Sequence, residues 1–384
     1  MMFCHTHSLF SKMFYPKVFC FGLCLFFYFL QVCSASDILS SSQDQIQQIF
    51  KDKETAVVRV KATRVDKLNS KAKRFLKMGS GFFISKDGHV LTTGLLSKAE
   101  RIWVEHRGTY LLAEEIGNDP MCNISLLKVM EPPADISFIK INDSFDQLAP
   151  GSFLVGITCA LEFRVSPTFG IAQSEEFSFG KRLFPTKMLR SSLALGPGEV
   201  GAPIFNLSGN FIGIAHAALP DLSSSFILPA KACKRIRDDL LLSGKVEYGW
   251  FGITTTRKLN DSNSFDIVIS GFIEDSPAKN SNLKIGDILL SVGQQKIMSQ
   301  GDLANASFFS EPETNVEFRI LRQDKELVVP VRVSARSFPN KEDSLSKFNI
   351  VESNASELSS TGNLKIDGIL DSNLTDNTDR LELK

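Results

Sequence analysis

A valine stands at the centre of the glycine-rich loop at residues 196–203 (GPGEVGAP). The side chain of Val200 has no nucleophile, no proton to give and no lone pair, so this loop cannot carry covalent acyl transfer. Outside the first 36 residues the histidines are His89, His106 and His216. We expect His89 and His106 on the surface, because the first lies in a turn before a strand and the second in a hairpin turn. We expect His216 to be a half-buried structural or pocket-lining residue, and no motif puts a serine or cysteine beside it for it to activate. The residue types thus predict no nucleophilic chemistry in this loop.

The composition is that of an exported protein with two or three domains. The chain has 384 residues, 43% of them hydrophobic, and its 43 basic and 43 acidic residues leave no electrostatic case for nucleic acid. Residues 1–36 read as a secretory signal peptide, since a short basic region precedes the apolar run Val18–Leu30 and small residues follow it. Two alternatives stay open. The segment is retained as a membrane anchor, or Cys33 is acylated as in a lipoprotein.

Three cysteines remain once the signal segment is set aside. They are Cys122, Cys159 and Cys233. Their wide spacing is neither a disulfide framework nor a metal site, and the sequence predicts no cofactor. We expect buried free thiols, with one disulfide plus one thiol as the alternative.

The remaining pattern is mainly β. An amphipathic segment at 37–50 precedes an alternating strand at 56–62, and residues 63–77 are too charged for a core. From Met78 to Asp239, short strands alternate with turns rich in Gly, Pro, Asn and Asp, which is typical of a β-barrel or sandwich. One helix is predicted at residues 230–242.

A series of short motifs, taken in their order along the chain, indicates resemblance to a known family. In order they are Gly79–Ile84 (GSGFFI), Asp87–Thr92 (DGHVLT), Asn118–Pro120 (NDP), Ile124–Lys128 (ISLLK), Gly201–Asn206 (GAPIFN), Gly209–Ile214 (GNFIGI) and Gly244–Ile253 (GKVEYGWFGI). Together they resemble the HtrA (Deg) serine proteases over about three quarters of the chain. The resemblance implies a mainly β protein, with a chymotrypsin/trypsin-like double β-barrel followed by a permuted PDZ domain of α+β type.

The same resemblance assigns the catalytic positions of the family to residues that cannot fill them. It puts the histidine at Leu95, the aspartate at Asn123 and the serine at Val200, with the oxyanion loop at Gly198 and Glu199. The Glu199 carboxylate either opposes an oxyanion or points into solvent. We therefore expect a pseudoprotease, not an enzyme. The alternative is an active serine endopeptidase of the family that uses residues outside these positions.

The resemblance also implies a peptide-binding loop in the second domain. Its residues are Gly249, Trp250, Phe251, Gly252 and Ile253. Successive backbone N–H groups of such a loop meet the terminal carboxylate of a peptide, which pairs with the following strand while the helix at 302–309 forms the far wall. Alternatively, Phe251 and Ile253 only pack the domain core.

These expectations define the domains and partners. The predicted segments are a signal peptide (1–36), an arm with the first strand (37–77), a protease-fold domain without the triad (78–243), a PDZ domain (244–336) and a disordered polar tail (337–384). The resemblance implies export to the periplasm or envelope and a role in protein quality control. Its implied partners are unfolded or C-terminal peptide segments, active HtrA-like proteases, and a homotrimer held by the apolar face of Ile46, Ile49 and Phe50.

Overall fold

The structure is a computed structural model that describes residues 41–336 except 69–70, 143–147, 181 and 261–262. The predictions for the signal segment and for the tail at 337–384 fall outside these residues. No helix among the described residues has the length and apolar character needed to cross a membrane.

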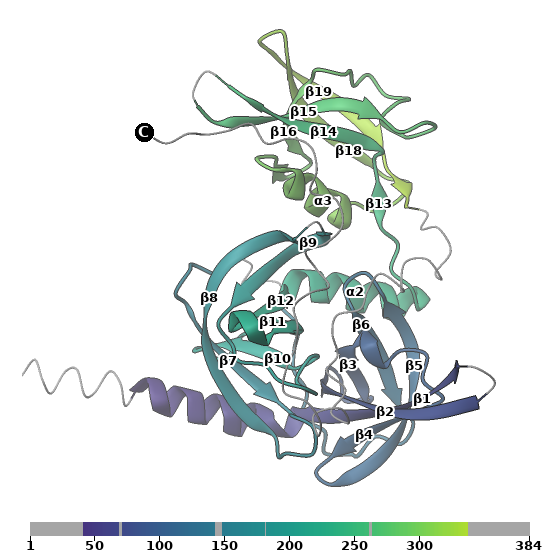
Figure 1. Cartoon of the computed structure of the whole chain (residues 1–384), viewed down its shortest axis with the longest axis vertical. Helices are drawn as coiled ribbons and strands as arrows, with labels where there is room; N and C mark the ends of the chain where they lie inside the picture. The colour runs from purple at the N-terminus through teal and green to yellow at the C-terminus, as the bar shows by residue number, and fades with distance from the viewer. Residues whose placement is uncertain (1–40, 69–70, 143–147, 181, 261–262, 337–384) are drawn as a thin grey trace, which may run out of the picture. The chain divides into compact units, whose positions relative to one another are not determined.

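The first half of the chain closes into a six-stranded antiparallel barrel (Figure 1), with the strand order β1-β2-β3-β6-β5-β4. Its strands are β1 (Val57–Leu68), β2 (Lys71–Phe83), β3 (His89–Thr93), β4 (Arg101–His106), β5 (Thr109–Asp119) and β6 (Ile124–Val129). Alternation along β1 turns Val58, Val60 and Ala62 into the barrel, where they are fully buried. Of the barrel or sandwich that the strand pattern predicts, the structure has the barrel, and this confirms the barrel fold that the family resemblance implies.

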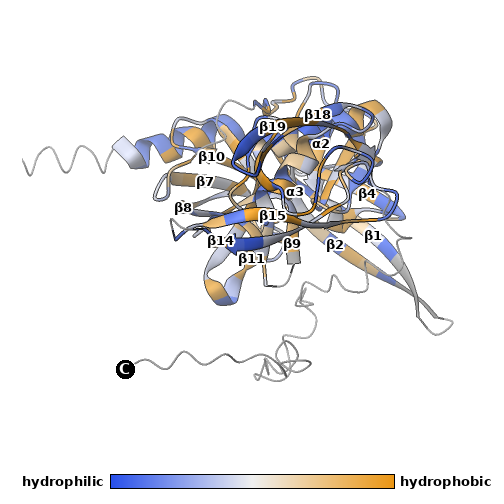
Figure 2. Cartoon of the chain, turned by 90° about the horizontal axis from the view of Figure 1, so that it is seen from above, coloured by the Kyte–Doolittle hydropathy of each residue, from blue (hydrophilic) through white to orange (hydrophobic). Residues whose placement is uncertain are grey.

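A second barrel follows, with the order β10-β11-β12-β9-β8-β7. Its strands are β7 (Phe153–Thr158), β8 (Ser166–Phe179), β9 (Arg182–Ser191), β10 (Pro203–Asn206), β11 (Phe211–Leu219) and β12 (Ser224–Pro229), and the short 3-10 helices of the two barrels are η1 (Glu54–Ala56), η2 (Gly94–Leu96) and η3 (Pro220–Leu222). Leu154, Ile204 and Ile212 belong to its core. Figure 2 shows hydrophobic and hydrophilic residues side by side along the strands, as expected where one face of a sheet is buried.

The charged segment at 63–77 is not an arm. It forms the outer part of the long β1–β2 hairpin, in which Thr63 pairs with Leu76, and β1 also pairs with β4 to close the barrel. The predicted domain start at residue 78 therefore cuts through β2, and the first barrel begins at Val57.

The helix at residues 41–53 packs on its own chain. Ile49 is only 5% exposed and shares a buried cluster with Phe205 and Phe211, while Ile46 and Phe50 are half-buried against that cluster. The apolar face invoked for a trimer is thus largely used within the chain, and the trimer stays a prediction.

Helix α2 (Ala230–Ser243) ends the barrel region, as predicted. Gly244 caps the helix with a left-handed φ of 71°. The next elements are β13 (Gly249–Trp250), β14 (Ile253–Leu259), β15 (Phe265–Phe272), β16 (Ile288–Val292), β17 (Gln295–Lys296), α3 (Gln300–Phe309), β18 (Asn315–Arg322), β19 (Lys325–Arg332) and β20 (Ser334–Ala335). The sheet order β14-β15-β16-β18-β19 leaves β14 at an edge.

One ion pair fastens the sheet of this second domain. Arg322 donates from Nε and Nη2 to the Asp287 carboxylate at 2.6 and 2.7 Å, and Asp287 is 1% exposed. Hydrogen bonding to Asp287 raises the pKa of Arg322. Removing one partner leaves the other as an uncompensated buried charge.

We expect Arg322→Met to lower the free energy of unfolding by about 3 kcal/mol, because the Asp287 carboxylate loses its partner. Urea denaturation of the full chain measures this. The control is Arg332→Met, whose pair with Glu313 is exposed on both sides and is expected to contribute less than about 1 kcal/mol. Equal losses in the two variants would contradict the prediction.

Candidate functional site

The first two of the three positions singled out in the sequence lie against each other. Leu95 belongs to η2, where its N–H donates to the side chain of Thr93 at 3.3 Å. The preceding residue, Gly94, donates its N–H to the Asn123 carbonyl at 2.9 Å. Asn123 itself has a left-handed φ of 54° just before β6. Leu95 and Asn123 are therefore held by one turn-to-turn contact.

The third position reaches the same neighbourhood from the second barrel. The carbonyl of Val200 accepts a hydrogen bond from the Ser80 N–H at 3.1 Å. A Cβ atom at Gly79 would lie 2.9 Å from Thr93 Cγ2 and 3.5 Å from the Val200 oxygen, so the loop and the end of β3 both pack on Gly79. Three segments distant in sequence thus meet where the barrels join.

The polar groups around these positions are engaged with backbone. Asn123 Nδ2 donates to the His216 carbonyl at 3.4 Å, and His216 Nδ1 lies 3.0 Å from the Cys122 carbonyl, to which it can only donate. His216 is 7% exposed and meets the Phe184 ring edge-on. It is a buried structural histidine, close to what was expected. The three gathered side chains, an isobutyl, a carboxamide and an isopropyl group, contain no base, acid or nucleophile.

The Glu199 carboxylate does not point into solvent. It folds back into the loop, where one oxygen accepts the Gly196 N–H and the other accepts the Thr158 hydroxyl. Gly198 has a φ of 83°, and a Cβ there would lie 2.7 Å from the Leu161 nitrogen. The loop is therefore braced from inside by Glu199, and only glycine fits at 198.

Both His89 and His106 were predicted to lie on the surface. His106 is instead buried, and His89 is half-buried. His106 was expected on the surface but is 4% exposed and packs edge-on against Phe83, with ring centroids 5.4 Å apart. It is the last inward residue of β4, and the turn begins one residue later, which explains the error. Burial, and then the charge of Arg107, lowers the pKa of His106. Burial and Lys128 also lower the pKa of His89.

The three cysteines are free and buried, as predicted. Burial raises the pKa of Cys159 to about 12 and also raises the pKa of Cys122 and Cys233. A thiol with so high a pKa stays protonated near neutral pH and is a poor nucleophile. Among the described residues, no group of acidic, histidine and cysteine side chains could hold a metal ion.

Asp119, part of the NDP motif, has a role that the sequence did not reveal. It is 1% exposed, and its carboxylate accepts the hydroxyl of Tyr248 and, at 3.0 Å, the Met121 N–H. Tyr248 directly precedes the Gly249–Ile253 loop. Burial raises the pKa of Asp119. This contact ties the end of β5 to the start of the second domain.

In the Gly249–Ile253 loop, two backbone N–H groups are available to a ligand, but the side chain of Phe251 is buried in the domain core. The Phe251 ring is 3% exposed and stacks edge-on against Phe318, with centroids 5.0 Å apart, so it packs the core and does not line a groove. The Phe251 and Gly252 carbonyls accept the Ala278 and Ile273 N–H groups. The N–H groups of Phe251 and Gly252 donate to no acceptor within the described part of the chain. The loop thus presents donors while its carbonyls hold it in place.

The strand that follows the loop and helix α3 each place one partly buried apolar side chain against the domain core. Ile253 at the start of β14 and Leu303 on α3 are half-buried against the domain core. Gln300, the first residue of α3, donates from Nε2 to the Thr255 carbonyl of β14 at 2.7 Å. Sequence reasoning missed Gln300 and Leu303. The capping pair Ser299 and Asp302 marks the helix start and could have found them.

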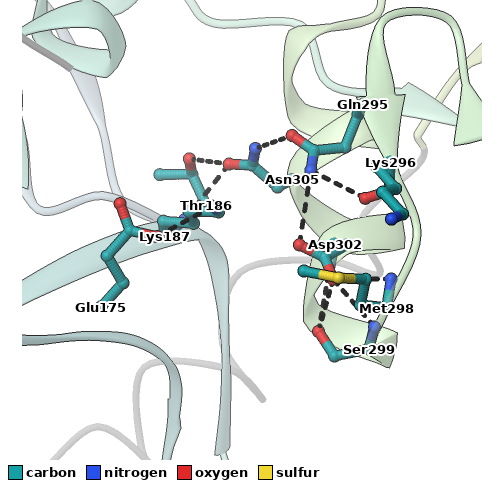
Figure 3. Close-up of polar contacts among 9 residues, drawn as sticks. All are labelled: Glu175, Thr186, Lys187, Gln295, Lys296, Met298, Ser299, Asp302 and Asn305. Carbon is teal, nitrogen blue, oxygen red and sulfur yellow. Dashed lines mark hydrogen bonds and ion pairs between the residues drawn. The ribbon is translucent and has the colours of Figure 1, made fainter. Parts of the chain in front are cut away.

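Helix α3 is also held by hydrogen bonds between Asn305 and strand β9. Asn305 accepts from the Thr186 hydroxyl at 2.7 Å and from the Lys187 N–H at 3.3 Å, and it donates to Gln295 at 3.0 Å (Figure 3). Phe177 of β8 packs so closely on Gly301 that a Cβ there would lie 2.0 Å from its ring. The helix therefore has a fixed position over β14.

Comparison with known proteins identifies both domains. A family model described as a trypsin-like peptidase domain matches residues 79–214, and one described as a PDZ domain matches residues 249–333. A probable periplasmic serine endoprotease, DegP-like, of Marinomonas sp. (strain MWYL1) is 31% identical over 273 residues, which are 67% of this chain and 57% of that protein. Its namesake from Pseudomonas fulva (strain 12-X) is 30% identical over 269 residues, covering 67% and 55%. The chain spans a little over half the length of these relatives.

Solved structures share the fold. The HtrA-type protease AlgW with decapeptide superposes with a TM-score of 0.61 at 20% identity, covering 77% of this chain and 99% of that one. The serine endoprotease from Yersinia pestis gives 0.55 at 21% identity, covering 76% and 98%. At such identities the likeness concerns the fold.

The buried Asp119 predicts a pH dependence of stability. Because its pKa is raised in the folded chain, its stabilising contribution is present in acid and is lost as pH rises through that pKa. We expect the stability of Asp119→Asn relative to the parent to improve from about pH 4 to about pH 7. Urea denaturation at each pH measures it.

Asp135→Asn is the control of opposite sign, because the hydrogen bond from Arg107 lowers the pKa of Asp135. This exposed carboxylate contributes above its unfolded pKa, so the variant should lose relative stability as pH rises. Parallel trends in the two variants would contradict the assignment.

Proposed function

We propose that this chain, which belongs to the HtrA (DegP-like) family of trypsin-like peptidase and PDZ proteins, is a non-catalytic member that binds peptide segments. One observation carries the proposal. The family's histidine, aspartate and serine correspond by motif order to Leu95, Asn123 and Val200, which meet at the junction of the barrels. None of them can act as base, orienting carboxylate or nucleophile. On this proposal the double barrel binds peptide segments and does not cleave them.

The preserved loop geometry supports a binding role. Gly198 keeps its left-handed backbone, and Glu199 braces the loop from within. Recognition of an extended segment through its backbone does not depend on a nucleophile.

The second domain supports binding of C-terminal segments. Its loop at 249–253 presents the N–H groups of Phe251 and Gly252, β14 has an open edge, and Ile253 and Leu303 supply partly buried apolar side chains. A terminal carboxylate needs such donors, because an unpaired charge is costly to bury.

The setting of this function is also part of the proposal. The relatives are named periplasmic, which fits the predicted export signal at residues 1–36. We propose an exported protein that acts in envelope protein quality control as a chaperone-like holder, a scaffold or a regulator of active HtrA-like proteases. Its homotrimer is part of the same proposal.

A second candidate rests on the names of the relatives, which are serine endoproteases. In that case a serine outside the family positions would be activated. Labelling by a fluorophosphonate probe separates the two, since the probe reacts with an activated serine and leaves a valine untouched.

We expect the purified chain from residue 37 to leave unfolded casein intact between about pH 5 and about pH 9, because Leu95, Asn123 and Val200 supply no triad chemistry. Val200→Ser alone should also be inactive, since its hydroxyl has no base to take its proton. Leu95→His and Asn123→Asp must be added before cleavage appears. Casein hydrolysis by the unmodified chain that persists through repurification would sink the proposal.

Peptides with a free hydrophobic C-terminus should bind at least about tenfold more tightly than their amidated forms. Amidation leaves the loop donors unpaired, which costs about 1 to 3 kcal/mol. Fluorescence anisotropy with both peptide forms measures the ratio. As a control, Gly252→Glu should abolish binding of the free acid, because a Cβ at 252 would lie 2.1 Å from Ser276 Cβ and the side chain adds a like charge. Equal affinities for both forms would assign this loop to the core alone.

A further inference from the structure

We propose that Gln300 is a built-in cap on the peptide groove, and that a peptide strand adds to β14 only after this side chain has left it. The proposal rests on the proposed peptide-binding function of the second domain and names a way in which that site is regulated.

The contact lies on the edge where a strand would add. Within the described residues β14 pairs with β15 alone. The Thr255 carbonyl accepts the Gln300 side-chain amide at 2.7 Å, and the Thr255 hydroxyl lies 3.5 Å from the same nitrogen. Thr255 therefore faces the open edge. Because alternate residues of a strand face the same edge, Ile253 does so too.

A bound peptide would compete with the Gln300 side chain for the Thr255 carbonyl. A peptide that pairs with β14 while its terminal carboxylate meets the loop at 251–253 places its last residue opposite Ile253. Pairing residue for residue then puts its third residue from the end opposite Thr255. The N–H of that residue needs the carbonyl oxygen that Gln300 occupies. Peptide and side chain thus compete for one acceptor.

The backbone of Gln300 is held in place by the start of α3, but its side chain can move. Gln300 opens α3 directly after Ser299, whose capping box with Asp302 fixes the first turn. The Asp302 carboxylate also accepts the Met298 N–H at 3.0 Å, and Asn305 anchors the helix to Thr186 (Figure 3). The Gln300 side chain itself is exposed. It can therefore swing away without moving the helix.

Such a cap has a plain physical purpose. An open strand edge pairs with any extended chain, and covering it with a polar side chain limits unwanted pairing. The cap costs affinity for every peptide by about the strength of one exposed hydrogen bond, which corresponds to roughly two- to tenfold. Peptides with a well-matched C-terminus overcome this cost, and internal segments do not.

The test uses the chain from residue 37 and a fluorescein-labelled ten-residue peptide with a free C-terminal leucine. Gln300→Ala should tighten binding about two- to tenfold, because the Thr255 oxygen is released. The same peptide N-methylated at its third residue from the end cannot donate to that oxygen, so it should show no gain. Gln294→Ala, which removes an exposed glutamine from the turn between β16 and β17, is the matched control and should leave both affinities unchanged.

A gain that is equal for both peptides, or no gain for the unmodified one, would overturn the cap. A second readout does not need any peptide. In a chain labelled with ¹⁵N-glutamine, the Gln300 side-chain amide, identified by its loss in Gln300→Ala, should exchange with solvent about two- to tenfold more slowly than the exposed Gln294 amide. Exchange as fast as at Gln294 would also overturn the cap. Protection of Gln300 together with a peptide that binds neither protein would leave the Gln300–Thr255 contact standing and would refute the peptide-binding function.

Discussion

The two barrels and the central loop all depend on the hydrogen bonds of one buried residue, Ser80. Its N–H donates to Val200 at 3.1 Å, and its hydroxyl donates to the Gly198 carbonyl and accepts the Cys159 N–H, each at 2.9 Å. The Thr92 hydroxyl donates to its carbonyl at 2.7 Å. A fully buried serine with all its groups paired gives one arrangement of these segments, because any shift would leave a polar group unsatisfied.

This arrangement does not need catalytic residues. The loop that a protease would use for its nucleophile is closed by Ser80, braced by Glu199, and packed against β2, where a Cβ at Gly201 would lie 2.2 Å from the Ser80 oxygen. These restraints are backbone and packing interactions, which a valine at position 200 leaves intact. The shape of this loop therefore does not depend on a nucleophile at position 200.

The second domain is organised around α3. On one side the helix meets the edge strand β14 through Gln300, and on the other it reaches β9 through Asn305. Its capping box holds the first turn between these contacts. The buried Tyr248–Asp119 hydrogen bond provides a further tie between the domains. Helix α3 is thus joined by side-chain hydrogen bonds both to the edge strand β14 and to β9.

The sequence alone determined the mainly β fold with its trypsin-like and PDZ domains, because turn residues, strand alternation and collinear motifs are local. The proposal that triad chemistry is absent also starts from the sequence, because the side chain of Val200 contains no nucleophile. Only the tertiary structure decided that His106 is buried, that residues 63–77 extend the β1–β2 hairpin, and that Glu199 folds back into its loop. It also revealed Gln300 on the edge of β14. The direction of a side chain and its partner depend on segments far apart in the chain, and spacing along the sequence does not encode these contacts.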